Sequence, residues 1–167
     1  MRRPFDRQVG HVALWLEERG RELEPDPVQA RRFLELLDPD ADFFSFRTFS
    51  ETPYTRVPGG DPLERSIHAP FEQCWSRLVA LNRAGAAVAV TINATNGRGR
   101  SIDDILRVRA LFLDLDRPEL CTKPLAPEPD ISVESSPGRF HHYWLTSGMP
   151  PAEFVPAQRA LARRYGG

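Results

Sequence analysis

Two aspartates at the end of an apolar run are the residues best suited, by type and spacing, to do chemistry. The run from Ala110 to Asp116 reads ALFLDLD, which predicts a strand. Because side chains alternate along a strand, Asp114 and Asp116 share one face about 7 Å apart, and the leucines point into the core. Magnesium binds one or two carboxylates and completes its shell with water and substrate phosphates, and two such ions can clamp a phosphoryl transfer. The pair predicts a divalent-metal site; the alternative is that Asp116 begins a turn and Asp114 is merely exposed.

Two adjacent histidines in a predicted hairpin are the second candidate. His141 and His142 lie on opposite faces of their strand, so they cannot bind one metal together as the paired histidines of a rolling-circle endonuclease do. His142 shares its face with Phe140 and Trp144, which indicates a packing role. His141 shares the polar face with Arg139, and an imidazolium beside a guanidinium is suited to bind a triphosphate.

A glycine- and arginine-rich loop is the third candidate. The segment 95–100 reads TNGRGR and follows Asn93. Its glycines let the backbone approach a phosphate, and its arginines, including Arg100, supply charge. The same letters also fit an ordinary Asn-Gly turn with solvated arginines. Further along, Arg107 and Arg109 are expected to balance neighbouring acidic residues or to compensate the aspartate pair.

The remaining pattern predicts the elements that position these residues. Asp26 can cap a helix that has Pro27 at its first position, and Ser101 can cap a short turn through Asp104. Helices interleaved with strands, one hairpin included, indicate an α+β domain with a mixed or antiparallel sheet. A long polar loop is expected over 50–68. The predicted helices cover 7–19, 70–84, 151–165 (irregular at Pro156) and a segment from Pro27 that buries Val28, Phe33, Leu34 and Leu37; the predicted strands cover 43–49, 86–93, 110–116, 131–134 and 139–145.

Length and composition restrict the class of protein. The chain has 167 residues, with 22 basic and 23 acidic side chains and a net charge of −1, so a nucleic-acid partner would have to be held by a local patch. No apolar run approaches the roughly 20 residues of a membrane helix, and we expect no membrane partner. Cys74 and Cys121 stand alone without metal-ligand spacing, which predicts reduced thiols in a cytoplasmic protein.

The segment from Phe43 to Gly167 resembles the RepB-like branch of the archaeo-eukaryotic primase superfamily, the primase and primase-polymerase domains of plasmid, phage and mobile-element replication proteins. The matching pieces occur in order: FFSFRTF, LNRAG, VTINATNGRGRSIDDILRVRALFLDLD and ISVESSPGRFHHYW. The resemblance implies a template-dependent nucleotidyltransferase that uses Mg²⁺ or Mn²⁺ to join nucleoside triphosphates on single-stranded DNA, with a replicative helicase as a partner. It also implies an RRM-like sheet with flanking helices that carries the metal site beside a smaller N-terminal α/β module. Residues 1–24 would form a helical extension and residues 25–167 the catalytic domain.

The same resemblance assigns roles to individual residues. Asp114 and Asp116 occupy the position of the superfamily's first metal-binding motif, which makes them the metal ligands and catalytic residues. His141 occupies the position of its serine-x-histidine-type nucleotide-binding motif. On this hypothesis, Arg139 and Ser136 help His141 to bind the incoming triphosphate.

Further expectations concern the edges of this site. Asn93 and Arg100 are expected to contact nucleotide or template. The superfamily's third motif, an acidic residue with arginines nearby, would follow the helix over 151–165, where this sequence ends. Asp130 and Glu134 are the nearest upstream acidic candidates, and we expect the sequence to be a C-terminally incomplete fragment of a longer replication protein.

Two other functions remain open. A non-catalytic DNA-binding replication module could have kept the primase scaffold; the missing third carboxylate favours it and the intact acidic pair opposes it. A metal-dependent nuclease also needs clustered carboxylates but typically adds a lysine beside them. The only lysine of this sequence, Lys123, lies in a proline-rich connection.

Overall fold

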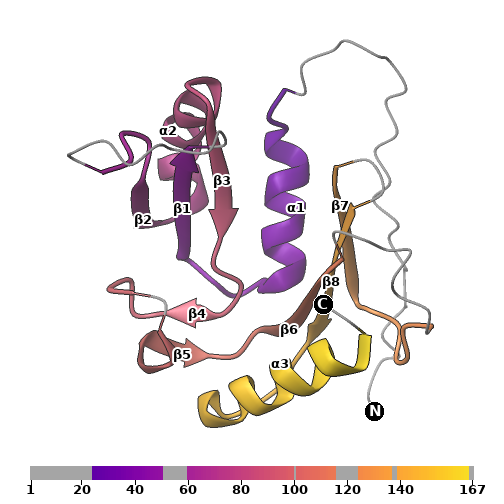
Figure 1. Cartoon of the computed structure of the whole chain (residues 1–167). Coiled ribbons are helices and arrows are strands. Elements are labelled where there is room, and N and C mark those ends of the chain that lie inside the picture. Colours follow the sequence, from indigo (N-terminus) through magenta and orange to yellow (C-terminus); the bar gives the residue numbers. More distant parts are fainter. Residues whose placement is uncertain (1–23, 51–59, 100, 116–123, 137–138, 166–167) are drawn as a thin grey trace, which may run out of the picture.

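The computed structural model describes residues 24–50, 60–99, 101–115, 124–136 and 139–165. Asp116, Arg100, the N-terminal helix expected over 7–19 and the expected turn at 137–138 lie outside these ranges, and so does most of the expected 1–24 extension. The described ranges form an α+β structure with three antiparallel sheets, which confirms the fold class and the antiparallel alternative for the sheet (Figure 1). The helices are α1 (Pro27–Leu37), α2 (Phe71–Arg83) and α3 (Pro151–Tyr165), with a single 3₁₀ turn, η1 (Ile102–Asp104).

Each of the two larger sheets contains a pair of neighbouring strands that are not consecutive in the chain. In the first sheet, β1 lies between β2 and β3; in the third, β8 lies between β6 and β7; and β4 pairs with β5 in a small second sheet. Every one of these described pairings is antiparallel. The strands are β1 (Phe44–Ser50), β2 (Arg65–Ala69), β3 (Ala86–Val90), β4 (Ala94–Thr95), β5 (Ile105–Arg107), β6 (Ala110–Leu115), β7 (Ile131–Ser136) and β8 (Arg139–Leu145).

Helix α1 begins as its sequence predicts. The Asp26 carboxylate accepts hydrogen bonds from the backbone N–H of Val28 at 2.8 Å and of Gln29 at 3.2 Å, and Pro27 fills the first helical position. Leu34 and Leu37 are buried as expected. Val28 is not: its side chain is 70% exposed, because the buried face of α1 begins only beyond its first turn.

Helix α1 joins the two larger sheets into one core. It stands between the first and third sheets (Figure 1), and its Phe33 packs edge-on against Tyr143 of β8 with ring centroids 5.3 Å apart. The main buried cluster therefore contains residues from α1, from α2 and from both sheets. A smaller cluster, Leu113, Leu115, Trp144 and Tyr165, lies where α3 covers the other face of β6 and β8.

Helix α3 also covers the outer edge of β6. The Gln158 side chain accepts a hydrogen bond from the Phe112 N–H at 3.2 Å and donates one to the Phe112 carbonyl oxygen. The edge strand is thereby paired with a side-chain amide instead of a further strand. The helix runs through Pro156 without a break in its assignment, although an irregularity was expected there.

The short strands depart most from the expectations. Strand β2 overlaps the last four residues of the loop predicted over 50–68. The strand was not predicted because its sequence is mostly polar and only Ile67 of its five residues is buried. Strands β4 and β5, of two and three residues, flank the loop over 95–100 and were not predicted. The capping box between Ser101 and Asp104 that closes this loop is confirmed. No helix in the described ranges is long and apolar enough to cross a membrane.

Candidate functional site

The pairing of β6 with β8 brings Asp114 and His141 together. The two residues are direct partners in the antiparallel register, so their side chains leave the sheet on the same face. His141 Nε2 lies 3.2 Å from Asp114 Oδ1. Both side chains remain accessible, with 57% of Asp114 and 37% of His141 exposed. An acceptor carboxylate and an imidazole are thus both available to one ligand.

Tyr143, two residues after His141 on the same face of β8, contacts its imidazole. Its ring is buried in the main core, and burial, with a smaller effect from the Asp114 charge, raises the pKa of Tyr143 to about 12. The phenol therefore stays protonated, and its oxygen lies 3.5 Å from His141 Nδ1. A long O–H···N bond of this kind favours the tautomer in which Nε2 carries the proton and donates a hydrogen bond to the Asp114 carboxylate.

His142 lies on the opposite face, as expected of a packing residue. Its ring stacks on Phe140 with centroids 5.9 Å apart, and its Nδ1 shares a 2.8 Å hydrogen bond with the Ser132 hydroxyl. Burial, and secondarily the neighbouring His141, lowers the pKa of His142. The neutral imidazole is favoured there, which suits packing rather than anion binding.

The Asp114–His141 pair lies in a cleft between the first and third sheets. Its volume is about 550 Å³, within the range of small-molecule sites. Arg47 and Phe49 of β1 form one wall, and Phe112 and Tyr143 contribute apolar surface beside the pair. Phe154 of α3 also lines the cleft, with its ring centroid 6.3 Å from that of Phe112. A cavity with mostly apolar walls and a few convergent polar groups is typical of a ligand site.

Asn93 lines the same cleft but uses its side chain within the fold. It is buried, and its amide oxygen accepts hydrogen bonds from the backbone N–H of Arg109 at 2.9 Å and of Ala110 at 3.3 Å. Asn93 thus fixes the start of β6 against the segment between β3 and β4. Its expected contact with nucleotide or template stays a prediction, and only the amide nitrogen is left for it.

The structure gives less information on the other expected site residues, which lie near the β7–β8 turn or outside the described ranges. Arg139 is exposed at the start of β8, and the backbone of Ser136 pairs with it at the end of β7. Asp116 and Arg100 lie outside the described residues. Of the two upstream acids considered as a third carboxylate, Asp130 accepts a hydrogen bond from the Leu145 N–H at 2.8 Å, so it serves the hairpin.

A buried ion pair behind the site was not predicted. Arg109 Nε lies 2.5 Å from Asp38 Oδ2, and only 4% and 2% of the two side chains are exposed. Arg107 donates to the same carboxylate from the surface. These arginines therefore do not balance the acidic residues beside them in sequence, nor the aspartate pair; they join β5 and β6 to the end of α1. The separation of 71 residues left no local signal.

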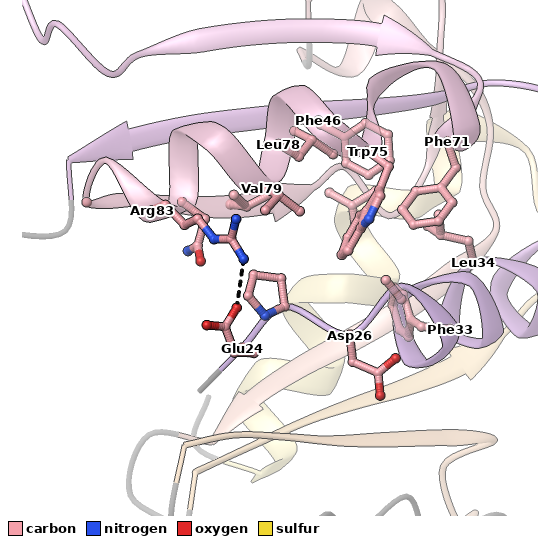
Figure 2. A pocket seen from close by; sticks show the side chains of 16 residues that line it. Glu24, Asp26, Phe33, Leu34, Phe46, Phe71, Trp75, Leu78, Val79 and Arg83 are labelled. Carbon is pink, nitrogen blue, oxygen red and sulfur yellow. Dashed lines mark hydrogen bonds and ion pairs between the residues drawn. The ribbon is translucent and has the colours of Figure 1, made fainter. Parts of the chain in front are cut away.

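A second cavity, of about 860 Å³, lies between α1 and α2 (Figure 2). Trp75 of α2 and Phe33 of α1 project toward each other across it, and its charged rim residues Glu24 and Arg83 form an ion pair at 3.0 Å. The cavity holds no free pair of catalytic groups comparable to Asp114 and His141, so we place the site in the first cleft.

The donor set suits a hard divalent ion only in part. Within the described ranges, no group of three or more His, Cys, Asp or Glu side chains is arranged to hold a metal. The exposed Asp114 carboxylate is the kind of ligand that Mg²⁺ or Mn²⁺ takes when water and substrate phosphates complete the shell. Asp114 therefore fits such an ion as one ligand among several.

Comparison with known protein families, with curated proteins and with solved structures found no match to this chain.

Proposed function

We propose that the chain is the catalytic part of a template-dependent nucleotidyltransferase, a DNA primase or primase-polymerase of a plasmid, phage or mobile element. The observation that carries the proposal is the Asp114–His141 pair at 3.2 Å in a cleft of about 550 Å³. The sequence resemblance assigned a metal ligand to the position of Asp114 and a nucleotide-binding residue to the position of His141. Residues 27 apart in the chain meet at one point, as one active site requires.

The roles of the residues follow from their chemistry. Asp114, together with Asp116, would hold Mg²⁺ or Mn²⁺, which when bound supplies charge neutralisation for phosphoryl transfer and for the leaving pyrophosphate. His141, whose Nε2 faces Asp114 in the structure, would turn the same N–H toward the anionic substrate, with the Tyr143 hydroxyl 3.5 Å from its Nδ1. Arg139 supplies a guanidinium on the same strand, two residues away and therefore on the same face, for the triphosphate.

The finer fold is part of the same proposal. The β6-β8-β7 sheet, which carries Asp114 and His141, would be the RRM-like sheet, and the β2-β1-β3 sheet with α1 and α2 would be the smaller N-terminal module. A cleft between two such units suits a reaction that brings a template, a primer end and a nucleotide together, because each unit can hold one partner.

The direct test is nucleotide incorporation. The full chain is incubated with a single-stranded DNA template, labelled nucleoside triphosphates and Mn²⁺, and products are separated by length. Asp114→Ala with Asp116→Ala is expected to reduce synthesis on the order of 100-fold or more, because both removed charges act in the transition state. Asp40→Ala removes an exposed carboxylate from a loop after α1 and is the matched control. Full activity in the double variant would refute the assignment.

A non-catalytic DNA-binding module that has kept the primase scaffold is the second candidate. Calorimetric titration with nucleoside triphosphate and with Mn²⁺ separates the two functions. The enzyme binds both, whereas a retained scaffold binds neither. Degradation of a labelled oligonucleotide without added nucleotides would favour a nuclease instead.

A further inference from the structure

The first sheet has one buried face and one open face. Along β1, Phe44, Phe46 and Thr48 are buried against the core, so the residues between them point the other way. We use the name open face for the surface formed by Phe43, Ser45, Arg47 and Phe49, together with His68, the partner of Ser45 on β2. Phe43 is 50% exposed and Phe49 is 42% exposed, although large aromatic residues are ordinarily buried. Two accessible rings on one side of one sheet need an explanation.

The Phe43 end of the open face is held in place. The Phe43 ring stacks on the His68 ring with centroids 5.5 Å apart and an angle of 16° between planes. His68 Nδ1 shares a 2.8 Å hydrogen bond with the Ser45 hydroxyl, which shares another of 2.8 Å with Thr95. The backbone at Gly97 packs so close to His68 that an added Cβ would lie 2.8 Å from the ring. The Phe43 end of the open face is therefore held in place before any ligand arrives.

The Phe49 end of the open face continues into the cleft. Arg47 and Phe49 line both surfaces, so a ligand on the open face would reach the side of the cleft opposite Asp114. Arg47 forms an ion pair with Glu64, the residue just before β2. Its Nε is buried and has no hydrogen-bond partner among the described residues, whereas 30% of the side chain as a whole is exposed. At the other end, the exposed Arg98 adds a second cation in the loop beside His68.

We propose that the open face binds a single-stranded nucleic acid by stacking bases on Phe43 and Phe49, with Arg47 and Arg98 toward its phosphates. Aromatic rings spaced along a sheet with arginines between them suit a polynucleotide, because every base has a face that stacks on an aromatic ring. A protein partner would favour a contiguous apolar patch, whereas polar Ser45 and Arg47 separate these two rings. The assignment of this strand as the template rests on the proposed function; the binding itself does not.

The dimensions set the length of the site. Phe49 follows Phe43 by six residue steps, about 20 Å at roughly 3.3 Å per residue. A stacked single strand rises about 3.4 Å per nucleotide, so the open face spans about six nucleotides, and fewer if the strand is extended. Affinity should therefore rise steeply with oligonucleotide length up to about six and only slowly beyond it.

The test is fluorescence anisotropy of labelled oligothymidylate with the full chain, without metal or nucleotide. Phe43→Leu and Phe49→Leu keep apolar bulk and remove the ring, and each is expected to weaken binding at least about fivefold, the lower end of what a stacked base contributes. Phe43→Trp restores a stacking surface and should bind at least as tightly as the parent. Val28→Ala, at a 70% exposed apolar position on α1, is the control and should leave affinity unchanged. Circular dichroism confirms that each variant is folded.

Different oligonucleotides and variants distinguish the possible outcomes of this binding experiment. Oligodeoxythymidylate and oligouridylate report whether the strand is DNA or RNA, and both should bind better than duplex DNA, whose bases are already stacked. Equal binding of duplex and single strand, or unchanged affinity in the Phe43→Leu/Phe49→Leu double variant, would overturn the proposal. Asp114→Ala should bind oligothymidylate normally, so loss of synthesis with retained binding tests the proposed function separately. If the Phe43→Leu/Phe49→Leu double variant matches the parent in both synthesis and oligothymidylate binding, the proposed role of the open face is wrong and the proposed function is unaffected.

Discussion

The buried ion pair between Asp38 and Arg109 gives the sharpest stability prediction. The Asp38→Ala substitution leaves the Arg109 guanidinium 4% exposed, without its carboxylate partner. Burial lowers the pKa of Arg109, and the hydrogen bond and charge of Asp38 oppose that shift, so the folded protein relies on Asp38 to keep this charge satisfied. Removing one partner of a buried pair typically costs about 3–5 kcal/mol.

The remaining contacts of Arg109 place the expected loss of stability at the lower end of this range of about 3–5 kcal/mol. After the substitution, Arg109 still donates to the Phe43 carbonyl oxygen at 3.3 Å, and its guanidinium carbon still lies 4.6 Å from the centroid of the Phe44 ring. We therefore expect a loss of about 3 kcal/mol, a large part of the stability of a domain this size. At roughly 2–4 °C per kcal/mol, the melting temperature should fall by about 6–12 °C.

Urea denaturation followed by circular dichroism and tryptophan fluorescence measures the change. Arg107→Ala is the matched control: it removes the exposed partner of the same carboxylate and should cost no more than about 1 kcal/mol. The Asp38→Leu/Arg109→Met double variant removes both charges and should recover most of the loss. A loss below about 1 kcal/mol for Asp38→Ala, or a double variant no more stable than the single one, would refute the reasoning.

Two further predictions concern local strain and acid stability. Gly97 has φ of +75° and lies against His68, whereas Gly85 has φ of +94° and open space where an added Cβ would lie. In urea denaturation, Gly97→Ala should therefore lower the free energy of unfolding by about 1 kcal/mol more than Gly85→Ala. Equal losses in the two variants would contradict the close approach of Gly97 to His68. The lowered pKa of His142 means that the unfolded chain binds a proton more readily than the folded one near pH 6, so the unfolding free energy should decrease as the pH falls below 6.5. This slope should be smaller in His142→Asn measured over the same pH range, and identical slopes would show that burial of His142 does not disfavour its protonation.

Much of the site geometry follows from local pattern, because strand alternation and antiparallel pairing are short-range rules. Alternation placed Asp114 on the accessible face of β6 and separated His141 from His142, and the structure agrees on both points. The cap at Asp26 was equally readable, since the helix N-terminus needs a nearby acceptor.

Features that depend on contacts between distant parts of the chain could not be predicted from the sequence. The partner of Arg109 lies 71 residues away, and nothing in its neighbourhood distinguishes it from an arginine paired with a sequence neighbour. Strand β2 contributes a single buried residue, Ile67, so its polar sequence resembles a loop. Val28 fits the helical stripe by spacing, but the extent of the surface that α1 meets decides which turns are buried.

Asp114 and His141 are proposed to form one site for a metal-bound triphosphate. Calorimetric titration of Mn²⁺ into the full chain, with saturating nucleoside triphosphate, tests it most directly. We predict saturable binding that Asp114→Asn weakens at least about tenfold and that Asp40→Asn leaves unchanged, since only Asp114 lies beside His141. Equal Mn²⁺ affinity in the Asp114→Asn variant and the parent chain would contradict the claim.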